Sequence, residues 1–151
     1  MKELVLVSCS GGMDSSTTLS ILKLAEYENI RAVHFKYGHR GEECEETAIT
    51  NVCKVMEIPL TVFDISENYK AMGVEDISML ANKDSKIITG TEAGLKTTAA
   101  WHPARNLLFM NYMIALAESE IGLENSMSYK NFTGMKTFAF KTDNNAYQIF
   151  N

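Results

Sequence analysis

The sequence has few cysteines and no long apolar run, and each shortage excludes a class of protein. Its three cysteines, Cys9, Cys44 and Cys53, are an odd number without a Cys-x-x-Cys spacing. They fit neither a disulfide framework nor a cysteine-rich zinc site. No stretch approaches the ~18–20 apolar residues that cross a bilayer, and residues 1–8 are too short and too lightly charged for a signal peptide. We therefore expect a cytoplasmic protein without a zinc site and without contact to a membrane.

An excess of basic residues is also lacking. Lysine and arginine number 14 against 19 aspartates and glutamates, which gives a formal net charge of −5. Binding of nucleic acid usually requires a basic face, so no direct contact with nucleic acid is expected. The 151 residues include only 2 prolines and 9 glycines, and 46% are hydrophobic. This composition excludes disordered and collagen-like classes and predicts one compact domain.

Strands and helices are predicted to alternate along the first part of the chain. The continuous apolar run Leu4–Val7 is typical of a strand buried on both faces, and helical spacing follows over about Asp14–Tyr27. Further strands are predicted at Ala32–Tyr37 and Leu60–Ile65, with a helix at about Glu42–Glu57 between them. This order favours right-handed βαβ crossovers. It predicts an α/β fold, a three-layer α/β/α sandwich with a parallel central sheet.

The second half of the chain is less regular. Residues 68–100 mix glycine, threonine, asparagine and lysine, which predicts a loop with short helical pieces that covers a site. The almost solidly apolar segment Asn106–Glu118 predicts a deeply buried helix that is too short to span a membrane. After Gly122 the pattern is weak, and at most a strand near Leu123–Tyr129 is predicted.

The sharpest motif lies between the first predicted strand and the first helix. It reads Ser10-Gly11-Gly12-Met13-Asp14-Ser15-Ser16, with Cys9 before it and Thr17 after it. Backbone N–H groups, hydroxyls and the positive helix end at such a loop form a site for phosphate, which glycines allow the backbone to approach. The alternative is a glycine-rich turn with Asp14 or Ser15 as a helix cap. The loops GxxxxGK[ST] and GxGxxG are both absent.

This motif, SGGxDS, resembles the pyrophosphate-binding loop of the N-type ATP pyrophosphatases, or adenine nucleotide alpha hydrolases. The resemblance implies a Rossmann-like, HUP-type fold and cleavage of ATP between its α and β phosphates. Asp14 would help to hold Mg²⁺, a hard cation suited to carboxylate and phosphate oxygens, and Asp14 and Ser15 would be catalytic. The residues implied to bind ATP in this loop are Cys9, Ser10, Gly11, Gly12, Met13, Asp14, Ser15, Ser16 and Thr17.

Two further segments narrow the resemblance. Tyr37-Gly38-His39-Arg40 precedes a glutamate-rich stretch, and Pro103-Ala104-Arg105-Asn106-Leu107-Leu108-Phe109 precedes the apolar helix. They resemble the YGQRH-x-x-E and P-[GA]-R-N-x-x-F segments of the 7-cyano-7-deazaguanine synthases of queuosine biosynthesis, with His39 in place of the glutamine. The resemblance implies ATP contacts by Tyr37, Arg40, Arg105 and Asn106, and a catalytic role for Arg105. A guanidinium at a helix start also favours a bound anion, because its charge otherwise opposes the helix dipole.

The resemblance implies a specific reaction. An ATP-binding ligase of this kind would adenylate the carboxylate of 7-carboxy-7-deazaguanine, release pyrophosphate and allow ammonia to attack, giving the nitrile. The cofactors would be ATP and Mg²⁺, and the small-molecule partner would be this deazapurine acid. A homodimer through the apolar helix is one form of assembly that we consider.

The resemblance becomes faint after about residue 120. Asn131-Phe132-Thr133-Gly134 is only distantly similar to the family's D-Y-S-G segment, and the later cysteine-rich zinc segment has no counterpart. We expect a shortened relative, either viral, a gene fragment or completed by a second chain. Residues 1–122 would form the nucleotide-binding domain and residues 123–151 a divergent extension of it. The alternatives to an active ligase are a nucleotide-binding module without catalysis and an interaction protein.

Overall fold

The computed structural model describes residues 4–73, 104–121, 128–132, 137–141 and 146–150. In chain order its elements are β1 (Leu4–Ser8), α1 (Met13–Leu24), β2 (Asn29–Lys36), α2 (Glu42–Met56), β3 (Leu60–Asp64), α3 (Ser66–Ala71), α6 (Arg105–Ile121), β4 (Ser128–Phe132), β5 (Thr137–Lys141) and β6 (Ala146–Phe150). The alternation of strand and helix from β1 to β3 confirms the predicted βαβ pattern.

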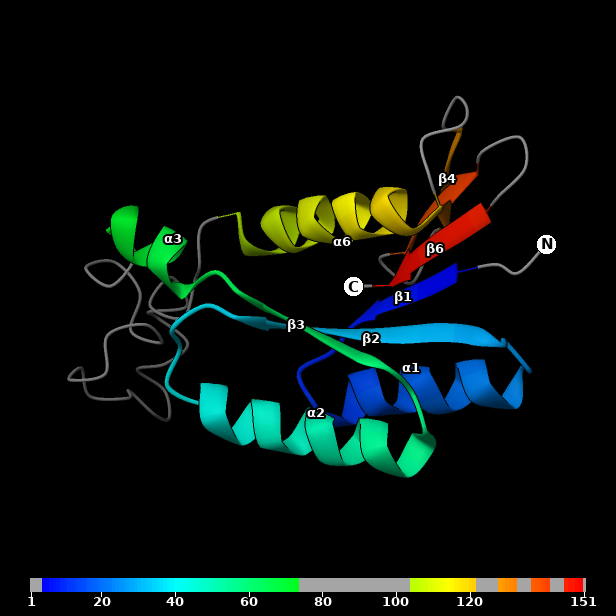
Figure 1. The fold of residues 1–151 in the computed structure, drawn as a ribbon, viewed down its shortest axis with the longest axis horizontal. Coiled ribbons are helices and arrows are strands. Elements are labelled where there is room, and N and C mark those ends of the chain that lie inside the picture. The colour runs from blue at the N-terminus through cyan, green and yellow to red at the C-terminus, as the bar shows by residue number, and fades with distance from the viewer. Residues whose placement is uncertain (1–3, 74–103, 122–127, 133–136, 142–145, 151) are drawn as a thin grey trace, which may run out of the picture.

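The six strands form one sheet in the order β3-β2-β1-β6-β5-β4 (Figure 1). β3, β2, β1 and β6 are parallel to one another, whereas β5 and β4 extend the sheet as antiparallel strands. The α/β class and the parallel central sheet are therefore confirmed, with an antiparallel extension on one side.

Helices cover both faces of the parallel strands, with α1 and α2 on one side and α6 on the other (Figure 1). Successive residues of a strand point to opposite faces. Leu4 and Leu6 of β1 accordingly pack in the cluster that includes α6. Val5 and Val7 pack in the cluster that includes α1 and α2. The apolar run in β1 is continuous because both faces of the strand are buried.

Helix α6 is buried along one stripe only. Phe109, Met113 and Ala117 are buried at four-residue spacing, which places them on one face of the helix. Leu107, by contrast, is 59% exposed. The prediction of a deeply buried helix is thus wrong in part: its sequence is apolar nearly all round, but the described residues cover a single face.

The weakly patterned C-terminal stretch contains three strands, so the prediction of at most one strand there is wrong. The single predicted strand was placed near Leu123–Tyr129, whereas β4 begins at Ser128 and is followed by β5 and β6. Each of these strands is only five residues long. They are strands because they pair with neighbouring strands. β6 pairs with β1, with Leu4 opposite Tyr147 and Val7 opposite Phe150. The division of the chain at residue 122 stays a prediction.

The ends of the elements differ slightly from expectation. α1 ends at Leu24 rather than near Tyr27, because Glu26 adopts a left-handed backbone conformation with φ of 59°. α3 falls within the start of the segment predicted to hold short helical pieces, and residues 74–100 of that segment lie outside the described residues. Among the described helices, none has the length and apolarity needed to span a membrane.

Candidate functional site

The chain enters the motif loop from the carboxyl end of β1, at a firmly held position. Cys9 is buried, its N–H donates to the carbonyl oxygen of Val33 at 2.8 Å, and its thiol donates to the carbonyl of Val7 at 3.3 Å. The bond to Val33 extends the pairing of β1 with β2 by one residue beyond Ser8. The loop therefore begins directly after a backbone position that is held by β2.

Gly11 brings the loop against helix α2. Its φ is +78°, a conformation that residues with a Cβ rarely adopt. A Cβ added at Gly11 would lie 2.5 Å from the backbone nitrogen of Ile49 and 2.7 Å from the Cβ of Ala48. Gly12, in contrast, has φ of −71°. A Cβ added at Gly12 would lie 3.4 Å from its nearest neighbour, the hydroxyl oxygen of Ser10. At Gly11 glycine is thus needed for packing on α2 as well as for any approach of phosphate.

The first turn of α1 has no side-chain cap. Gly12 occupies the N-cap position, so the alternative interpretation, in which Asp14 or Ser15 caps the helix, does not hold. The hydroxyls of Ser15 and Ser16 instead donate to the carbonyl oxygen of Gly12 at 3.1 and 2.9 Å. An uncapped helix start leaves backbone N–H groups for an anion, and the positive end of the helix dipole adds to the attraction.

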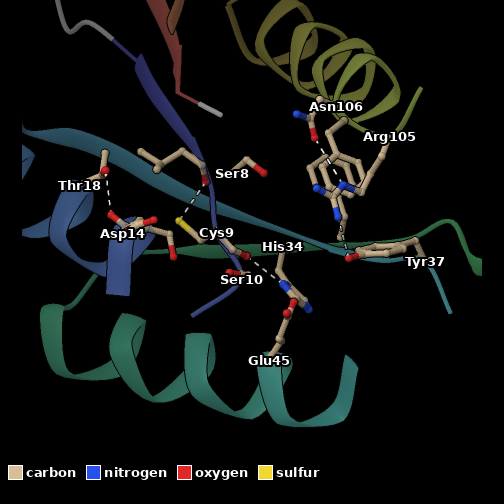
Figure 2. A pocket seen from close by; sticks show the side chains of 14 residues that line it. Ser8, Cys9, Ser10, Asp14, Thr18, His34, Tyr37, Glu45, Arg105 and Asn106 are labelled. Carbon is tan, nitrogen blue, oxygen red and sulfur yellow. Dashed lines mark hydrogen bonds between the residues drawn. The ribbon is translucent and has the colours of Figure 1, made fainter. Parts of the chain in front are cut away.

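A cavity of about 410 Å³ lies at the carboxyl ends of β1 and β2, between the first turns of α1 and α6 (Figure 2). Ligands of open α/β sheets bind at this edge. The lining residues are Val7, Ser8, Cys9, Ser10, Asp14, Ser15, Thr18, His34, Phe35, Tyr37, Glu45, Arg105, Asn106 and Phe109. The cavity thus brings together side chains from the first 45 residues and from the start of α6.

Seven of the predicted site residues line this cavity. They are Cys9, Ser10, Asp14, Ser15, Tyr37, Arg105 and Asn106. The other predicted residues are not among its lining residues: Gly11, Gly12, Met13, Ser16, Thr17 and Arg40. Met13 is 82% exposed, whereas Gly11 is turned toward α2. The roles given to all these residues remain predictions.

Arg105 and Tyr37 form the wall of the cavity on the α6 side. One terminal nitrogen of Arg105 donates to the Tyr37 hydroxyl at 3.4 Å, and the guanidinium carbon lies 5.8 Å from the centre of the Tyr37 ring. Burial raises the pKa of Tyr37, an effect that the nearby Arg105 charge opposes. Within the described part of the chain, Arg105 has no carboxylate partner, so its charge faces the cavity without neutralisation.

The sequence interpretation missed seven lining residues, of which Ser8, Thr18, His34 and Glu45 are polar and Val7, Phe35 and Phe109 are apolar. Thr18 lies one helical turn after Asp14, and its hydroxyl donates to the Asp14 carbonyl at 3.0 Å. His34 lies in the middle of β2 and belongs to no motif that the sequence shows. Glu45 was hidden within a run of glutamates at the start of α2.

His39 is a buried turn residue beside the cavity. Its Nδ1 accepts the N–H of Gly41 at 3.1 Å, and its ring stacks on Tyr37 with centres 4.4 Å apart. Its Nε2 lies 3.3 Å from a carboxylate oxygen of Glu45, close enough for attraction but without hydrogen-bond geometry. Burial lowers the pKa of His39, and the charges of Glu45 and Glu42 oppose this.

The described residues contain no group of three or more histidine, cysteine, aspartate or glutamate side chains that could hold a metal ion by themselves. Mg²⁺ does not require such a group, because it is commonly held by one or two carboxylates together with phosphate oxygens and water. Asp14 supplies one exposed carboxylate on the cavity wall, next to the uncapped helix start. The residues present therefore fit Mg²⁺ bound together with a phosphate ligand.

Comparison with known proteins identifies relatives for most of the chain. The family model described as queuosine biosynthesis protein QueC matches residues 4–136. The 7-cyano-7-deazaguanine synthase 2 of Sulfurisphaera tokodaii is 35% identical over 115 residues, which are 76% of this chain and 24% of that protein. The 7-cyano-7-deazaguanine synthase of Nitratiruptor is 37% identical over 125 residues, which are 80% of this chain and 51% of that protein.

The chain thus spans between about a quarter and a half of the length of these curated relatives. Among solved structures, an NH3-dependent NAD synthetase from Campylobacter jejuni aligns with 84% of this chain and 46% of its own, at 19% identity and a TM-score of 0.46.

Proposed function

The chain belongs to the family of the queuosine biosynthesis protein QueC, and from this we propose that it binds ATP in the cavity and acts as an ATP pyrophosphatase-type ligase. The observation that carries the proposal is the meeting of the SGGxDS loop and Arg105 in one cavity. These groups lie about 90 residues apart in the sequence. Uncapped N–H groups, hydroxyls and a guanidinium around a common space are suited to a polyphosphate.

The start of α1 and Arg105 would bind different parts of the triphosphate. The start of α1 would take the phosphates released as pyrophosphate, because its N–H groups and dipole are fixed before the ligand arrives. Arg105 would bind phosphate oxygens from the opposite wall, oriented by Tyr37 and by Asn106, whose amide oxygen accepts from Arg105 Nε at 3.4 Å. A ligand held from both sides has its α phosphate presented between them.

Magnesium has a defined place in this proposal. Asp14 would hold Mg²⁺ against the phosphates, and the ion when bound would neutralise part of their negative charge. The serine hydroxyls of the loop would hold phosphate oxygens. Their present bonds to the carbonyl of Gly12 leave the lone pairs of the hydroxyl oxygens available.

The specific reaction that we propose is the one for which the relatives are named, the synthesis of 7-cyano-7-deazaguanine. The carboxylate of 7-carboxy-7-deazaguanine would attack the α phosphate of ATP, so that the acid becomes an acyl adenylate and pyrophosphate leaves. Ammonia would then attack the acyl carbon and displace AMP to give the primary amide, and loss of the amide oxygen as water would give the nitrile. Phe35, Tyr37 and Phe109 supply apolar surface along the cavity, which suits a planar heterocycle.

The proposal is tested in two steps with the 151-residue chain. Calorimetry with ATP and Mg²⁺ should detect binding, and absence of binding would refute the nucleotide site. Pyrophosphate release should then depend on both 7-carboxy-7-deazaguanine and ammonium. Binding of ATP without any release of pyrophosphate would instead support the alternative function, a nucleotide-binding module without catalysis.

A further inference from the structure

The cavity has one wall rich in hydrogen-bond donors and another rich in acceptors. Around the start of α1 the backbone N–H groups, and opposite them Arg105, are hydrogen-bond donors that suit an anion, and Asp14 beside them suits a cation bound with it. At the wall between β2 and α2 the side chains of His34 and Glu45 line the same space. This second wall has no part in the proposed phosphate site, and its groups have the chemistry of acceptors.

His34 presents an unpartnered acceptor. The side chain is 1% exposed, and its Nδ1 lies 2.9 Å from the carbonyl oxygen of Cys9. Because a carbonyl can only accept, Nδ1 carries the proton, and in the neutral ring Nε2 holds a free lone pair. No residue that the structure describes hydrogen-bonds to this Nε2. Buried nitrogen atoms of this kind normally have a partner.

Glu45 adds a negative charge on the same wall. Its carboxyl group reaches from α2 toward the imidazole of His34 (Figure 2). The ion pair recorded for Glu45 within the described part of the chain is with His39, at 3.3 Å, and none is formed with His34. The side chain is 37% exposed and ends a flexible stem, so it can adjust to a ligand. The lone pair of His34 Nε2 and the carboxylate of Glu45 both accept hydrogen bonds. A ligand atom that carries several N–H groups could donate to both of them.

We propose that His34 and Glu45 form a binding site for a nitrogen that bears N–H groups, namely an amino or ammonium nitrogen. This inference rests on the proposed function, because ATP and ammonium, the two reactants of that function considered below, both carry such a nitrogen. Two sources supply such a nitrogen: the 6-amino group of adenine and free ammonium. His34 would then select the ligand, and Glu45 would add electrostatic attraction for a cation.

The adenine source is tested by comparing ATP with inosine triphosphate, which has the same triphosphate but an acceptor oxygen in place of the 6-amino group. If His34 accepts from that amino group, the unaltered chain should bind ATP about tenfold more tightly. His34→Leu should abolish this preference, and His34→Gln, which retains an acceptor, should keep part of it. The ratio of affinities is the decisive quantity. Both substitutions also remove the bond between His34 and the Cys9 carbonyl. This loss would weaken the binding of both nucleotides equally, because they share the triphosphate.

The ammonium source is tested without nucleotide or activity. Histidine labelled with ¹³C and ¹⁵N gives a ring signal for His34, assigned by its loss in His34→Leu. Ammonium chloride should shift this signal, whereas potassium chloride, a cation of similar size without N–H groups, should not. Glu45→Gln should reduce the response to ammonium several-fold.

Each outcome decides the inference. A preference for ATP that depends on His34 supports the adenine source, and a shift specific to ammonium supports the ammonium source. If ATP and inosine triphosphate bind equally and ammonium leaves the His34 signal unchanged, the acceptor site is refuted while the phosphate site stands. If neither nucleotide binds, the proposed function fails, and the ammonium titration alone decides whether His34 and Glu45 bind an N–H donor.

Discussion

Gly11 and Ala48 are packed so closely that a methyl group on Gly11 would lie 2.7 Å from the Cβ of Ala48. The motif loop is therefore held by helix α2 as well as by the strand before it. The contact places a small residue of α2 against a loop far away in the sequence. The position of this loop therefore depends on its packing against α2.

Replacement of Gly11 by alanine should destabilise the fold. The substitution combines a left-handed backbone with overlap against Ile49 and Ala48, so we expect the free energy of unfolding to fall by about 2 kcal/mol or more. Urea denaturation measures this change. Gly12→Ala is the matched control and should cost less than about 1 kcal/mol, because its φ is negative and its surroundings are open. Equal losses for the two variants would contradict the role of the α2 contact.

Arg105→Lys should weaken ATP binding about tenfold, since lysine keeps the charge but loses the planar fork that binds two oxygens. Calorimetry measures the change. Arg31→Lys serves as the control, because Arg31 forms an ion pair with Glu120 and is not among the residues that line the cavity. An unchanged affinity in Arg105→Lys would remove Arg105 from the proposed site.

Asp14→Asn should abolish pyrophosphate release at ordinary Mg²⁺ concentrations and leave the melting temperature nearly unchanged, because this side chain is exposed. A coupled pyrophosphate assay over a range of Mg²⁺ concentrations measures the effect. Glu43→Gln is a matched control, an exposed acidic residue in the first turn of α2. If both variants retain full release, Asp14 does not hold the metal ion.

The three thiols should differ in reactivity. Burial raises the pKa of Cys9 and Cys53, so both remain protonated at pH 8, whereas Cys44 is exposed. A disulfide reagent at pH 8 should modify Cys44 rapidly and the other two only after unfolding. Because the folded-state pKa exceeds the unfolded value, unfolded thiols ionise first and stability should fall as the pH rises above about 9. Rapid reaction of all three thiols in the folded protein would contradict the described burial.

Phe109→Ala should cost about 3–5 kcal/mol of stability. Phe109 is 8% exposed and its ring stacks on Phe35 with centres 4.1 Å apart. Leu107→Ala, on the exposed side of the same helix, should cost less than about 1 kcal/mol. Thermal unfolding distinguishes the two, and similar losses would indicate that the outer face of α6 is also covered.

The elements from β1 to β3 could be predicted because their signals are local. A continuous apolar run, helical spacing and a proline at position 59 each specify structure within a few residues. β6 could not be predicted in this way, since its identity as a strand depends on pairing with β1 at the other end of the sequence. Stability of short strands comes largely from such partners.

Some residues of the candidate site could likewise be predicted from local signals, and others could not. Asp14, Ser15 and Arg105 lie in motifs that can be identified from adjacent residues, and all three line the cavity, while their roles stay predictions. His34 and Glu45 carry no local motif, because what makes them notable is a shared wall between β2 and α2. The missing partner of His34 Nε2 is a property of the fold and is invisible in the sequence.

The pairing of β6 with β1 also affects the order of folding. β1 is made first on the ribosome, yet one of its two neighbours in the sheet is the strand at residues 146–150. Until that strand emerges, one edge of β1 has unpaired backbone groups, and closing the sheet requires contacts between residues far apart in the chain. Such long-range contacts slow folding. Until they form, the unpaired edge of β1 can pair with strands of other chains. A nascent chain of this protein is therefore expected to need protection from aggregation until synthesis has passed β6.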